Sequence, residues 1–464
     1  MLLSLRDVLE ATGGKTTASS KDICFRGIST DSRKIKKGDL FIPLRGPNFD
    51  GRDFICDALK KGAAGIASSV RGIKPGKNRA AILLPATPKK DRKLYPELKA
   101  LHRIAGRHRA DLPVKLVAVT GSSGKTTTKD MIHGVLSAHG TCLKTEENLN
   151  NEIGVPLTLL GLSNKHRYAV VEIGMQGPEE IRPLSVLCLP DVAAITNIGE
   201  AHIGRLKNKR NIASAKRELL DGLKRNGSAI LNADDKYFGF LKRGAKGKKV
   251  LSFGIRNPAR LRAFDIKPSG KGSEFKMKIN GRQHSFFVPL PGEHNIYNAL
   301  IAIATGIALN IPLKSIKKGL IAFKPSSKRM DITTTKSGIK LINDTYNANP
   351  SSMSAAVKTL AAEKGRKIAV LGDMLELGKD SRKYHLDIGR QLKRTGIDIV
   401  IAVGKQAGYY ISGSTTAADR FFAGKQKAAR HLLKLLKPGD TVLIKASRGL
   451  KLEEITQKIL DNTD

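Results

Sequence analysis

The chain has 464 residues, of which 82 are lysine or arginine and 41 are aspartate or glutamate, a formal net charge of +41. Hydrophobic residues make up 40% of it, which supplies several packed cores and excludes a disordered chain. The longest nearly apolar stretch, residues 299–309, is too short to span a bilayer, and at about 150 residues per domain the length predicts three domains.

The first predicted domain covers residues 1–86 and holds short apolar runs between turns. Two of these runs, residues 39–44 and 65–67, indicate strands of a small α/β unit. Residues 87–113 are basic and compatible with a helix, which we predict to link this unit to the next one.

The second predicted domain, residues 87–323, begins with that linking helix. A β-branched run at residues 114–119 predicts a strand, and further buried strands follow at residues 168–173, 192–196 and 228–231. Helical patterns separate these strands, so we expect a mostly parallel sheet.

The third predicted domain, residues 324–464, begins at a break near residues 323–327 that contains Pro325 and two serines. Its expected strands lie at residues 339–342, 367–371, 397–403 and 441–444 and alternate with helices. The predicted fold class is therefore α/β, in three domains, of which the last has a Rossmann-like sheet of its own.

A phosphate-binding loop is the first motif that carries chemistry. Residues 120–127 lie between a predicted strand and a helix, where glycines let backbone N–H groups close around phosphate oxygens. Lys125 can reach the β- and γ-phosphates, and Thr126 can ligate Mg²⁺. The general motif has four residues between its glycines, and this loop has two; a ligand-free Gly/Ser turn is disfavoured by the complete strand–loop–helix context. The predicted ATP-binding residues are Thr120, Gly121, Ser122, Ser123, Gly124, Lys125, Thr126 and Thr127.

Two titratable side chains follow neighbouring strands. Glu172 ends the strand at residues 168–173, and His202 follows the strand at residues 192–196. Ligands of open α/β sheets bind at the carboxyl edge of the strands, and Mg²⁺ prefers such carboxylate oxygens. Each residue alone also fits an ordinary structural role.

Two further segments have two interpretations each. Residues 344–350, Asp-Thr-Tyr-Asn-Ala-Asn-Pro, form either an Asx turn or a ribose and phosphate contact. Residues 292–298 begin a helix, and their side-chain amides either cap it or contact an adenine edge.

Together these segments resemble the Mur ligase family. The similarity lies in the phosphate loop, in the Asn-Leu-Asn-Asn-Glu-Ile-Gly-Val-Pro run at residues 148–156, and in the motifs at residues 172–174, 197–202, 344–350 and 371–378. It starts at residues 29–46 and covers essentially the whole chain. The runs at 148–156 and 344–350 are most similar to members that join D-alanyl-D-alanine to a UDP-N-acetylmuramoyl-tripeptide.

The resemblance implies an ATP-dependent ligase of peptidoglycan precursor synthesis. The tripeptide carboxylate attacks the γ-phosphate of ATP, and the amine of D-alanyl-D-alanine displaces phosphate from the resulting acyl phosphate. It also implies that the first domain binds the UDP substrate, that the central domain binds ATP, and that two Mg²⁺ ions take part.

The resemblance assigns a role to each matching residue. Catalytic roles are implied for Lys125, Glu172, His202 and Lys216. Metal ligands are implied at Thr126, Glu172, His202 and Lys216, the last of them as a carbamate. Asn298, Arg329 and Asp344 are implied to contact the nucleotide. Substrate contacts are implied for Ser32, Arg33, Asn148, Asn150, Asn151, Tyr346, Asn347 and Asn349.

The sequence departs from the family pattern at four positions where glycine is usual. Glu147 precedes the Asn148 run, Lys207 follows His202, Lys328 precedes Arg329, and Ala446 lies in the Lys-Ala-Ser-Arg run at residues 445–448. None of these changes removes an expected metal or phosphate ligand, but they bear on the geometry of the loops.

Partners and compartment follow from composition and resemblance together. No two of the four cysteines have C-x-x-C spacing, and the first residues lack the pattern of a secretory signal, which favours a cytoplasmic protein with reduced thiols. The partners we expect are small-molecule substrates, with no membrane insertion, and the family pattern implies a monomer. Basic residues are dispersed, and aromatic residues are 5% with no tryptophan, so we expect no nucleic acid. Two alternatives to the implied function remain. The chain is either another Mur or folylpolyglutamate-type ligase, or a basic ATPase that binds nucleic acid.

Overall fold

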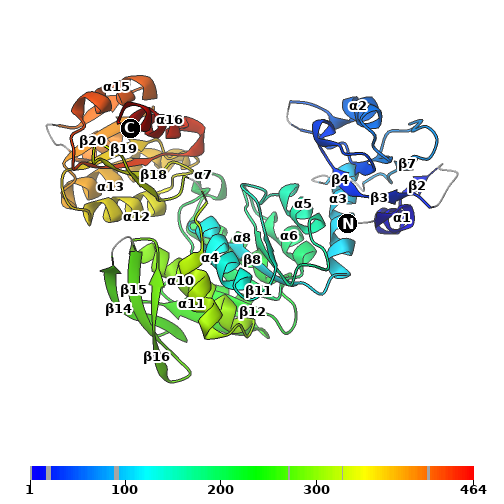
Figure 1. The fold of residues 1–464 in the computed structure, drawn as a ribbon, viewed down its shortest axis with the longest axis horizontal. Helices are drawn as coiled ribbons and strands as arrows, with labels where there is room; N and C mark the ends of the chain where they lie inside the picture. Colours follow the sequence, from blue (N-terminus) through cyan, green and yellow to red (C-terminus); the bar gives the residue numbers. More distant parts are fainter. Residues whose placement is uncertain are drawn as a thin grey trace.

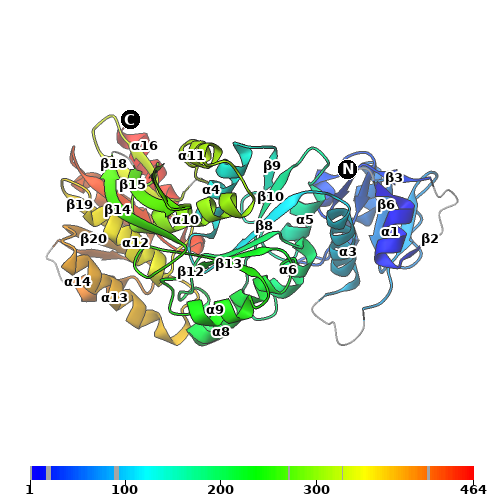
Figure 2. The ribbon, with the colours of Figure 1, turned by 90° about the horizontal axis from the view of Figure 1, so that it is seen from below.

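The structure is a computed structural model that describes residues 3–16, 22–46, 48–87, 94–269, 272–326, 328–414 and 418–463. Figure 1 shows three lobes, blue at the N-terminus, cyan to green in the centre and yellow to red at the C-terminus. In Figure 2 the central lobe lies between the other two. Residues 89–93 of the predicted basic segment lie outside the described residues, as does Ser327 of the predicted break.

The first lobe contains a small sheet in the order β2-β7-β6-β5-β4, with β4 to β7 parallel and β2 antiparallel to β7. The predicted runs at residues 39–44 and 65–67 supply β5 and β6. The elements are β1 (Leu3–Ser4), α1 (Leu5–Thr12), β2 (Lys15–Thr16), β3 (Cys24–Phe25), β4 (Gly27–Ser29), β5 (Asp39–Phe41), α2 (Ile55–Lys60), β6 (Gly65–Ser68) and β7 (Ala80–Leu83).

The predicted linking helix is α3 (Pro96–Ala110), shorter than the basic segment that suggested it. Tyr95 precedes the helix and Pro96 occupies its first turn, where a missing N–H costs no hydrogen bond. One side of α3 packs on α1, and other parts of it pack on α5 and α6 of the central lobe. The helix is thus shared between two lobes.

The central sheet has the order β16-β15-β14-β13-β12-β11-β8-β10-β9, with parallel pairing from β9 to β14. The strands predicted at residues 114–119, 168–173, 192–196 and 228–231 are β8, β10, β11 and β12. The elements are β8 (Lys115–Thr120), α4 (Lys125–Ser137), β9 (Cys142–Lys144), α5 (Gly154–Leu160), β10 (Tyr168–Glu172), α6 (Ile181–Cys188), β11 (Val192–Ile195), α7 (Ile203–Leu206), α8 (Lys209–Arg217), β12 (Ser228–Asn232), α9 (Phe238–Gly244), β13 (Lys249–Gly254), β14 (Leu261–Ser269), β15 (Gly272–Ile279), β16 (Arg282–Val288), α10 (Glu293–Ala308) and α11 (Leu313–Ala322).

Strand β8 lies between β10 and β11, and its side chains are buried on both faces. Val117 and Val119 face α4, α10 and α11 in one hydrophobic cluster, whereas Leu116 and Ala118 belong to the cluster on the opposite face. A strand covered on both faces needs a continuous apolar sequence, which is the pattern that predicted it. The antiparallel edge β14-β15-β16 was not predicted.

The last lobe has a sheet in the order β17-β18-β22-β19-β20-β21, parallel except for β17. The four strands predicted there are β18, β19, β20 and β22. The elements are β17 (Asp331–Thr334), β18 (Lys340–Asp344), α12 (Pro350–Ala361), β19 (Lys367–Gly372), α13 (Ser381–Arg394), β20 (Ile399–Val403), α14 (Gly408–Ser414), β21 (Arg420–Phe422), α15 (Lys425–Leu435), β22 (Thr441–Lys445) and α16 (Glu453–Thr463).

The α/β fold class with mostly parallel sheets is confirmed in all three lobes. Within the described ranges, no helix combines the length and apolar character needed to cross a bilayer.

Candidate active site

The phosphate loop joins β8 to α4 and is fixed by the strand beside it. The Thr196 hydroxyl donates to the Ser123 carbonyl over 2.6 Å, and the Ser123 N–H donates to the Asn197 side chain over 3.0 Å. Gly121 has φ 155°, and a Cβ there would lie 1.8 Å from the Thr196 hydroxyl. Glycine is therefore required at this turn, because any side chain would displace the loop from β11.

Two lysines point at one carbonyl group of this loop. Both the Lys125 and the Lys216 ammonium groups lie 2.9 Å from the Gly121 oxygen. Burial, followed by the charge of Lys125, holds the pKa of Lys216 well below its usual value. Burial also lowers the pKa of Lys125, although Glu172 partly opposes the effect. Lys125 lines the cavity above the loop, whereas Lys216 lies behind the loop and is 1% exposed.

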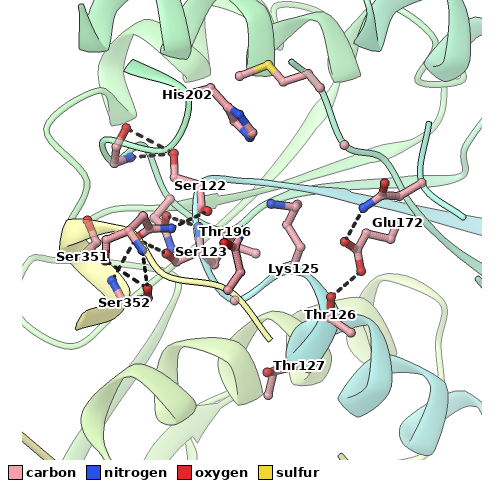
Figure 3. Close-up of a pocket in the computed structure, with 18 of the residues that line it drawn as sticks. Ser122, Ser123, Lys125, Thr126, Thr127, Glu172, Thr196, His202, Ser351 and Ser352 are labelled. Carbon is pink, nitrogen blue, oxygen red and sulfur yellow. Dashed lines mark hydrogen bonds between the residues drawn. The ribbon is translucent and has the colours of Figure 1, made fainter. Parts of the chain in front are cut away.

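The hydroxyl of Thr126 and the carboxylate of Glu172 meet at the start of α4. Thr126 Oγ1 donates to Glu172 Oε2 over 2.7 Å, and the Asn150 amide donates to Glu172 Oε1 over 2.9 Å. Figure 3 shows Thr126 and Glu172 on one side of Lys125. Among the described residues, no three His, Cys, Asp or Glu side chains gather to hold a metal. One hydroxyl and one carboxylate nevertheless fit Mg²⁺ that takes its other ligands from phosphate and water.

His202 faces a partner from the last lobe. Its Nδ1 lies 2.7 Å from Glu376 Oε2, and this close contact lowers the pKa of Glu376. The Gly204 N–H donates to the Glu376 carbonyl over 3.1 Å, so the two loops are joined through side chain and backbone. The sequence had suggested His202 but not Glu376.

Helix α12 of the last lobe rests on the phosphate loop. Asn349 Oδ1 accepts from the Ser352 N–H over 2.9 Å, which caps the helix, and from the Ser123 hydroxyl over 3.1 Å. Ser351 donates to Glu200 over 2.7 Å. Figure 3 shows Ser351 and Ser352 beside Ser122 and Ser123, on the side of Lys125 away from Glu172.

The residues around Asp344 form a charged cluster at the end of β18. Lys445, 2% exposed, donates to the Asp344 carboxylate and to the Asn347 carbonyl, the latter over 2.9 Å. The Arg329 guanidinium stacks on the Tyr346 ring at 3.8 Å from its centre, and its buried Nε has no hydrogen-bond partner in the structure. An unpaired guanidinium beside the phosphate loop suits an anionic ligand.

A cavity of about 1240 Å³ connects these groups and receives side chains from all three lobes. Most predicted site residues line it. Those lining it are Ser122, Ser123, Gly124, Lys125, Thr126, Thr127, Asn148, Asn150, Asn151, Glu172, His202, Asn298, Arg329, Asp344, Tyr346, Asn347 and Asn349.

Several predicted residues have other surroundings. Ser32 and Arg33 are not among the residues that line the cavity; Arg33 is 84% exposed and pairs with Asp31. Thr120 lies beneath the loop, where its hydroxyl donates a hydrogen bond to the Ile173 carbonyl over 2.8 Å. Asn151 lines the cavity but also accepts from the Gly154 N–H at the start of α5, over 2.9 Å.

Asn298 is similarly committed to internal contacts. It is 5% exposed, accepts from the Thr128 hydroxyl over 3.1 Å and donates to Asn295 over 3.2 Å. A Cβ at Gly124 would lie 2.5 Å from its Oδ1, so Asn298 packs directly against the phosphate loop.

Sequence reasoning missed Asn197, Glu376 and Lys445 as site residues. Asn197 and Glu376 lie inside motifs that carried the family resemblance. The motifs were recognised, but they assigned no role to these two residues. Lys445 ends β22, which pairs with β18 next to Asp344, and only the order of strands reveals that neighbour.

Comparisons with known proteins agree with this geometry. Three family descriptions match the chain: "Mur ligase family, catalytic domain" over residues 25–108, "Mur ligase middle domain" over residues 119–306, and "Mur ligase, glutamate ligase domain" over residues 328–448. The matched segments fall in the three lobes in chain order.

Several relatives match nearly the whole chain. The UDP-N-acetylmuramoyl-tripeptide–D-alanyl-D-alanine ligase of Bacillus subtilis is 37% identical over 442 residues, which cover 94% of this chain and 93% of the relative. The ligase of the same name from Escherichia coli is 36% identical and covers 95% of each chain.

Solved structures agree with these relatives. MurF from Acinetobacter baumannii superposes with a TM-score of 0.91 at 32% identity and 99% coverage of both chains. MurF from Thermotoga maritima in complex with ADP superposes with a TM-score of 0.83 at 25% identity, and the match covers 94% of this chain and 98% of that one. A folylpolyglutamate synthase from Mycobacterium tuberculosis, 17% identical, shares the fold alone. The chain belongs to the Mur ligase family.

Proposed function

We propose that this protein is an ATP-dependent ligase that joins D-alanyl-D-alanine to a UDP-N-acetylmuramoyl-tripeptide in peptidoglycan precursor synthesis. The full-length similarity to ligases of that name supports this function. The single structural observation that carries it is the cavity in which the phosphate loop, the Thr126–Glu172 pair and Arg329 of the last lobe face one another.

The residues of the loop would bind and orient ATP. Lys125 would leave the Gly121 carbonyl for the phosphates, where its charge and the N–H groups at the start of α4 neutralise the transferred group. Arg329, whose Nε is buried and unpaired, would approach the same phosphates from the last lobe. Phosphoryl transfer of this kind depends on positioning and charge neutralisation.

Thr126 and Glu172 would hold one Mg²⁺, and Asn150 would keep the Glu172 carboxylate turned toward it. When bound, the ion supplies charge that polarises the phosphate oxygens. His202 would help with a second ion, with Glu376 orienting its imidazole. We retain the substrate roles of Asn148, Asn151, Tyr346, Asn347 and Asn349, and those of Ser32 and Arg33 for the UDP moiety, as proposals.

Lys216 fits a second ion only in modified form, because an ammonium group is not a metal ligand. We propose that its neutral amine adds CO₂, forming a C–N bond and releasing one proton to give a carbamate. The low pKa of this buried amine favours the reaction. The carbamate N–H could still donate to the Gly121 carbonyl.

The tripeptide carboxylate would attack the γ-phosphate, releasing ADP and forming an acyl phosphate. The amine of D-alanyl-D-alanine then adds to the acyl carbon, and phosphate and a proton leave as the amide forms. This sequence needs no protein nucleophile. Because ATP and nucleotide-linked precursors are its proposed substrates, we also propose a cytoplasmic location. The family pattern leads us to propose a monomer.

A phosphate-release assay tests the function directly. Purified protein receives ATP, Mg²⁺ and a UDP-muramoyl-tripeptide with either lysine or diaminopimelate as third residue, together with D-alanyl-D-alanine, single amino acids or RNA. We expect release that depends on the dipeptide. Release stimulated by an amino acid alone would favour another ligase, and release stimulated by RNA without any dipeptide effect would contradict the proposal.

A further inference from the structure

A buried carboxylate on α4 takes no part in the chemistry proposed above. The Asp130 side chain is 0% exposed and accepts from the Lys144 ammonium over 2.7 Å, with the Lys129 ammonium 3.6 Å away. Asp130 lies five residues after Lys125, little more than one helical turn into α4. Two cations around one carboxylate keep it charged in spite of its burial.

The same carboxylate holds a residue distant in the sequence. Asp130 Oδ2 accepts from the Ser326 N–H over 3.0 Å and from the Ser326 hydroxyl over 2.6 Å. Ser326 lies between α11 and β17, where the chain leaves the central lobe. A Cβ at Gly134 would lie 2.7 Å from the Phe323 Cβ, so this segment lies directly along α4.

Two residues further on, the chain is held by the last lobe. The Lys328 ammonium lies 2.9 Å from Glu453 on α16, and the Lys328 carbonyl accepts from the Tyr346 N–H over 3.1 Å. Arg329 follows at once and stacks on Tyr346 in the cavity. Ser326 therefore contacts the central lobe, whereas Lys328 contacts the last lobe.

The turn of α4 that carries Asp130 is also linked, through Thr145, to the backbone of the residue proposed to bind Mg²⁺. The Lys129 ammonium donates to the Thr145 carbonyl over 2.9 Å, and the Thr145 hydroxyl accepts from the Glu172 N–H over 3.0 Å. One helical turn thus contacts Ser326 directly and the strand end that bears Glu172 through Thr145.

We propose that Asp130 is a positioning residue that fixes the crossing at Ser326 to the phosphate-loop helix and so sets where Arg329 meets the bound nucleotide. The inference rests on the proposed function, because Arg329 matters only if the nucleotide binds at the loop. Asp130 itself touches no substrate. It acts through the two hydrogen bonds to Ser326, which precedes Arg329 by three positions in the sequence.

Ser326→Ala removes the 2.6 Å hydrogen bond and leaves the central core intact. We expect kcat to fall about tenfold, the size of one lost hydrogen bond to a charged acceptor, while the affinity for ADP stays within about twofold. Ser326→Thr, which keeps the hydroxyl, should restore most of kcat. Ser137→Ala, an exposed serine near the end of the same helix, is the matched control and should behave as the parent.

A second readout does not depend on ligase activity. Hydrogen exchange of the peptide covering residues 323–331 is measured with and without ADP and Mg²⁺. In the parent, ADP should slow the exchange, and in Ser326→Ala and Asp130→Asn the slowing should be lost although ADP still binds. If the parent shows no dipeptide-dependent turnover, the proposed function has failed, and this exchange experiment still decides the role of Asp130.

Two results would overturn the inference. One is a Ser326→Ala enzyme equal to Ser137→Ala in kcat and in the ADP response. The other is a loss in kcat that comes with an equal loss of ADP affinity and is not restored by threonine, because that pattern marks local damage. If Asp130→Asn fails to fold, the Ser326 pair carries the test alone.

Discussion

Lys125 is the residue on which the phosphate chemistry depends most directly. Its half-buried side chain lines the cavity, and its ammonium shares the Gly121 carbonyl with Lys216. Lys125→Ala should lower turnover by at least ~10², the scale of losing one preorganised electrostatic group. Steady-state phosphate release measures this turnover. The control is Lys165→Ala, which replaces an exposed lysine outside the cavity. Turnover within threefold of the parent would remove the loop from the active site.

Lys216 gives a second prediction at the same scale. Lys216→Ala should lose most activity, because the carbamate that we propose at this position would disappear. A small carboxylic acid such as acetate should restore part of the activity by entering the space left behind the loop. Arg210→Ala, on the exposed side of the same helix, is the matched control. Full activity in Lys216→Ala without added acid would contradict the carbamate.

Three of the four departures from glycine have a structural cost. Glu147, Lys207 and Lys328 adopt φ values of 43°, 69° and 63°, in the left-handed region that a Cβ disfavours. The family pattern of glycine at these positions thus matches the backbone, and this sequence keeps the conformation without the residue that suits it.

Glu147→Gly should therefore stabilise the protein by about 0.5–1 kcal/mol. This is the backbone strain that glycine relieves in the folded protein, minus the conformational entropy that glycine adds to the unfolded chain. Urea unfolding measures the change in the free energy of unfolding. The neighbouring exposed Glu146, which has no positive φ, is the control, and Glu146→Gly should destabilise the protein by about 0.5–1 kcal/mol. Equal effects of the two substitutions would show that φ at residue 147 carries no strain.

At the scale of elements, helix α13 is tied to β19 through a buried histidine. His385 is 0% exposed; its Nε2 accepts from the Met374 N–H over 3.1 Å, and its Nδ1 donates to the Ser381 carbonyl over 2.7 Å. Only the neutral ring can make both hydrogen bonds. Burial accordingly lowers the pKa of His385, although the bond to Ser381 opposes the effect.

Acidification should weaken this link. The unfolded chain takes up a proton near the usual histidine pKa of about 6.5, whereas folded His385 resists it, so stability falls as the pH drops below that value. The slope from this group is about 1.4 kcal/mol per pH unit until the lowered folded pKa is reached. Urea unfolding at pH 6.5 and 5.5 should show a smaller loss for His385→Gln than for the parent. His284→Gln on β16 should keep the loss of the parent, and an identical loss in both variants would exclude His385 as its source.

At the scale of the whole molecule, the active site is assembled from parts that the sequence separates widely. Asn349 reaches the Ser122–Ser123 segment, Glu376 reaches His202, and Ser326 reaches Asp130. The cavity also includes Arg45 and Tyr95 from the first lobe and α3 region. Because few hydrogen bonds join the lobes at these points, ligands that contact several lobes should draw them together.

Small-angle scattering measures that change. Addition of a non-hydrolysable ATP analogue with a UDP-muramoyl-tripeptide should lower the radius of gyration, and either ligand alone should lower it less. Profiles that stay the same in a sample with full ligase activity would show that the lobes do not move during binding.

The sequence by itself determined the local elements and the chemistry of the loop. Strand β8 was recognisable because a strand buried on both faces must be apolar throughout, and the loop at residues 120–127 because phosphate binding needs glycine, lysine and a hydroxyl in one short run. Glu172 and His202 were placed at one edge of the sheet because the strands before them are parallel.

Tertiary structure alone decided which of these side chains meet. Lys445 beside Asp344, Glu376 beside His202 and Asp130 beside Ser326 are pairs separated by 101, 174 and 196 positions, of which the first and last are joined by hydrogen bonds. The antiparallel edge β14–β16 and the two lysines on the Gly121 carbonyl were also beyond local reasoning. Periodicity and motifs report a residue's neighbours along the chain, whereas strand order and lobe packing bring distant residues together, and no local pattern encodes that arrangement.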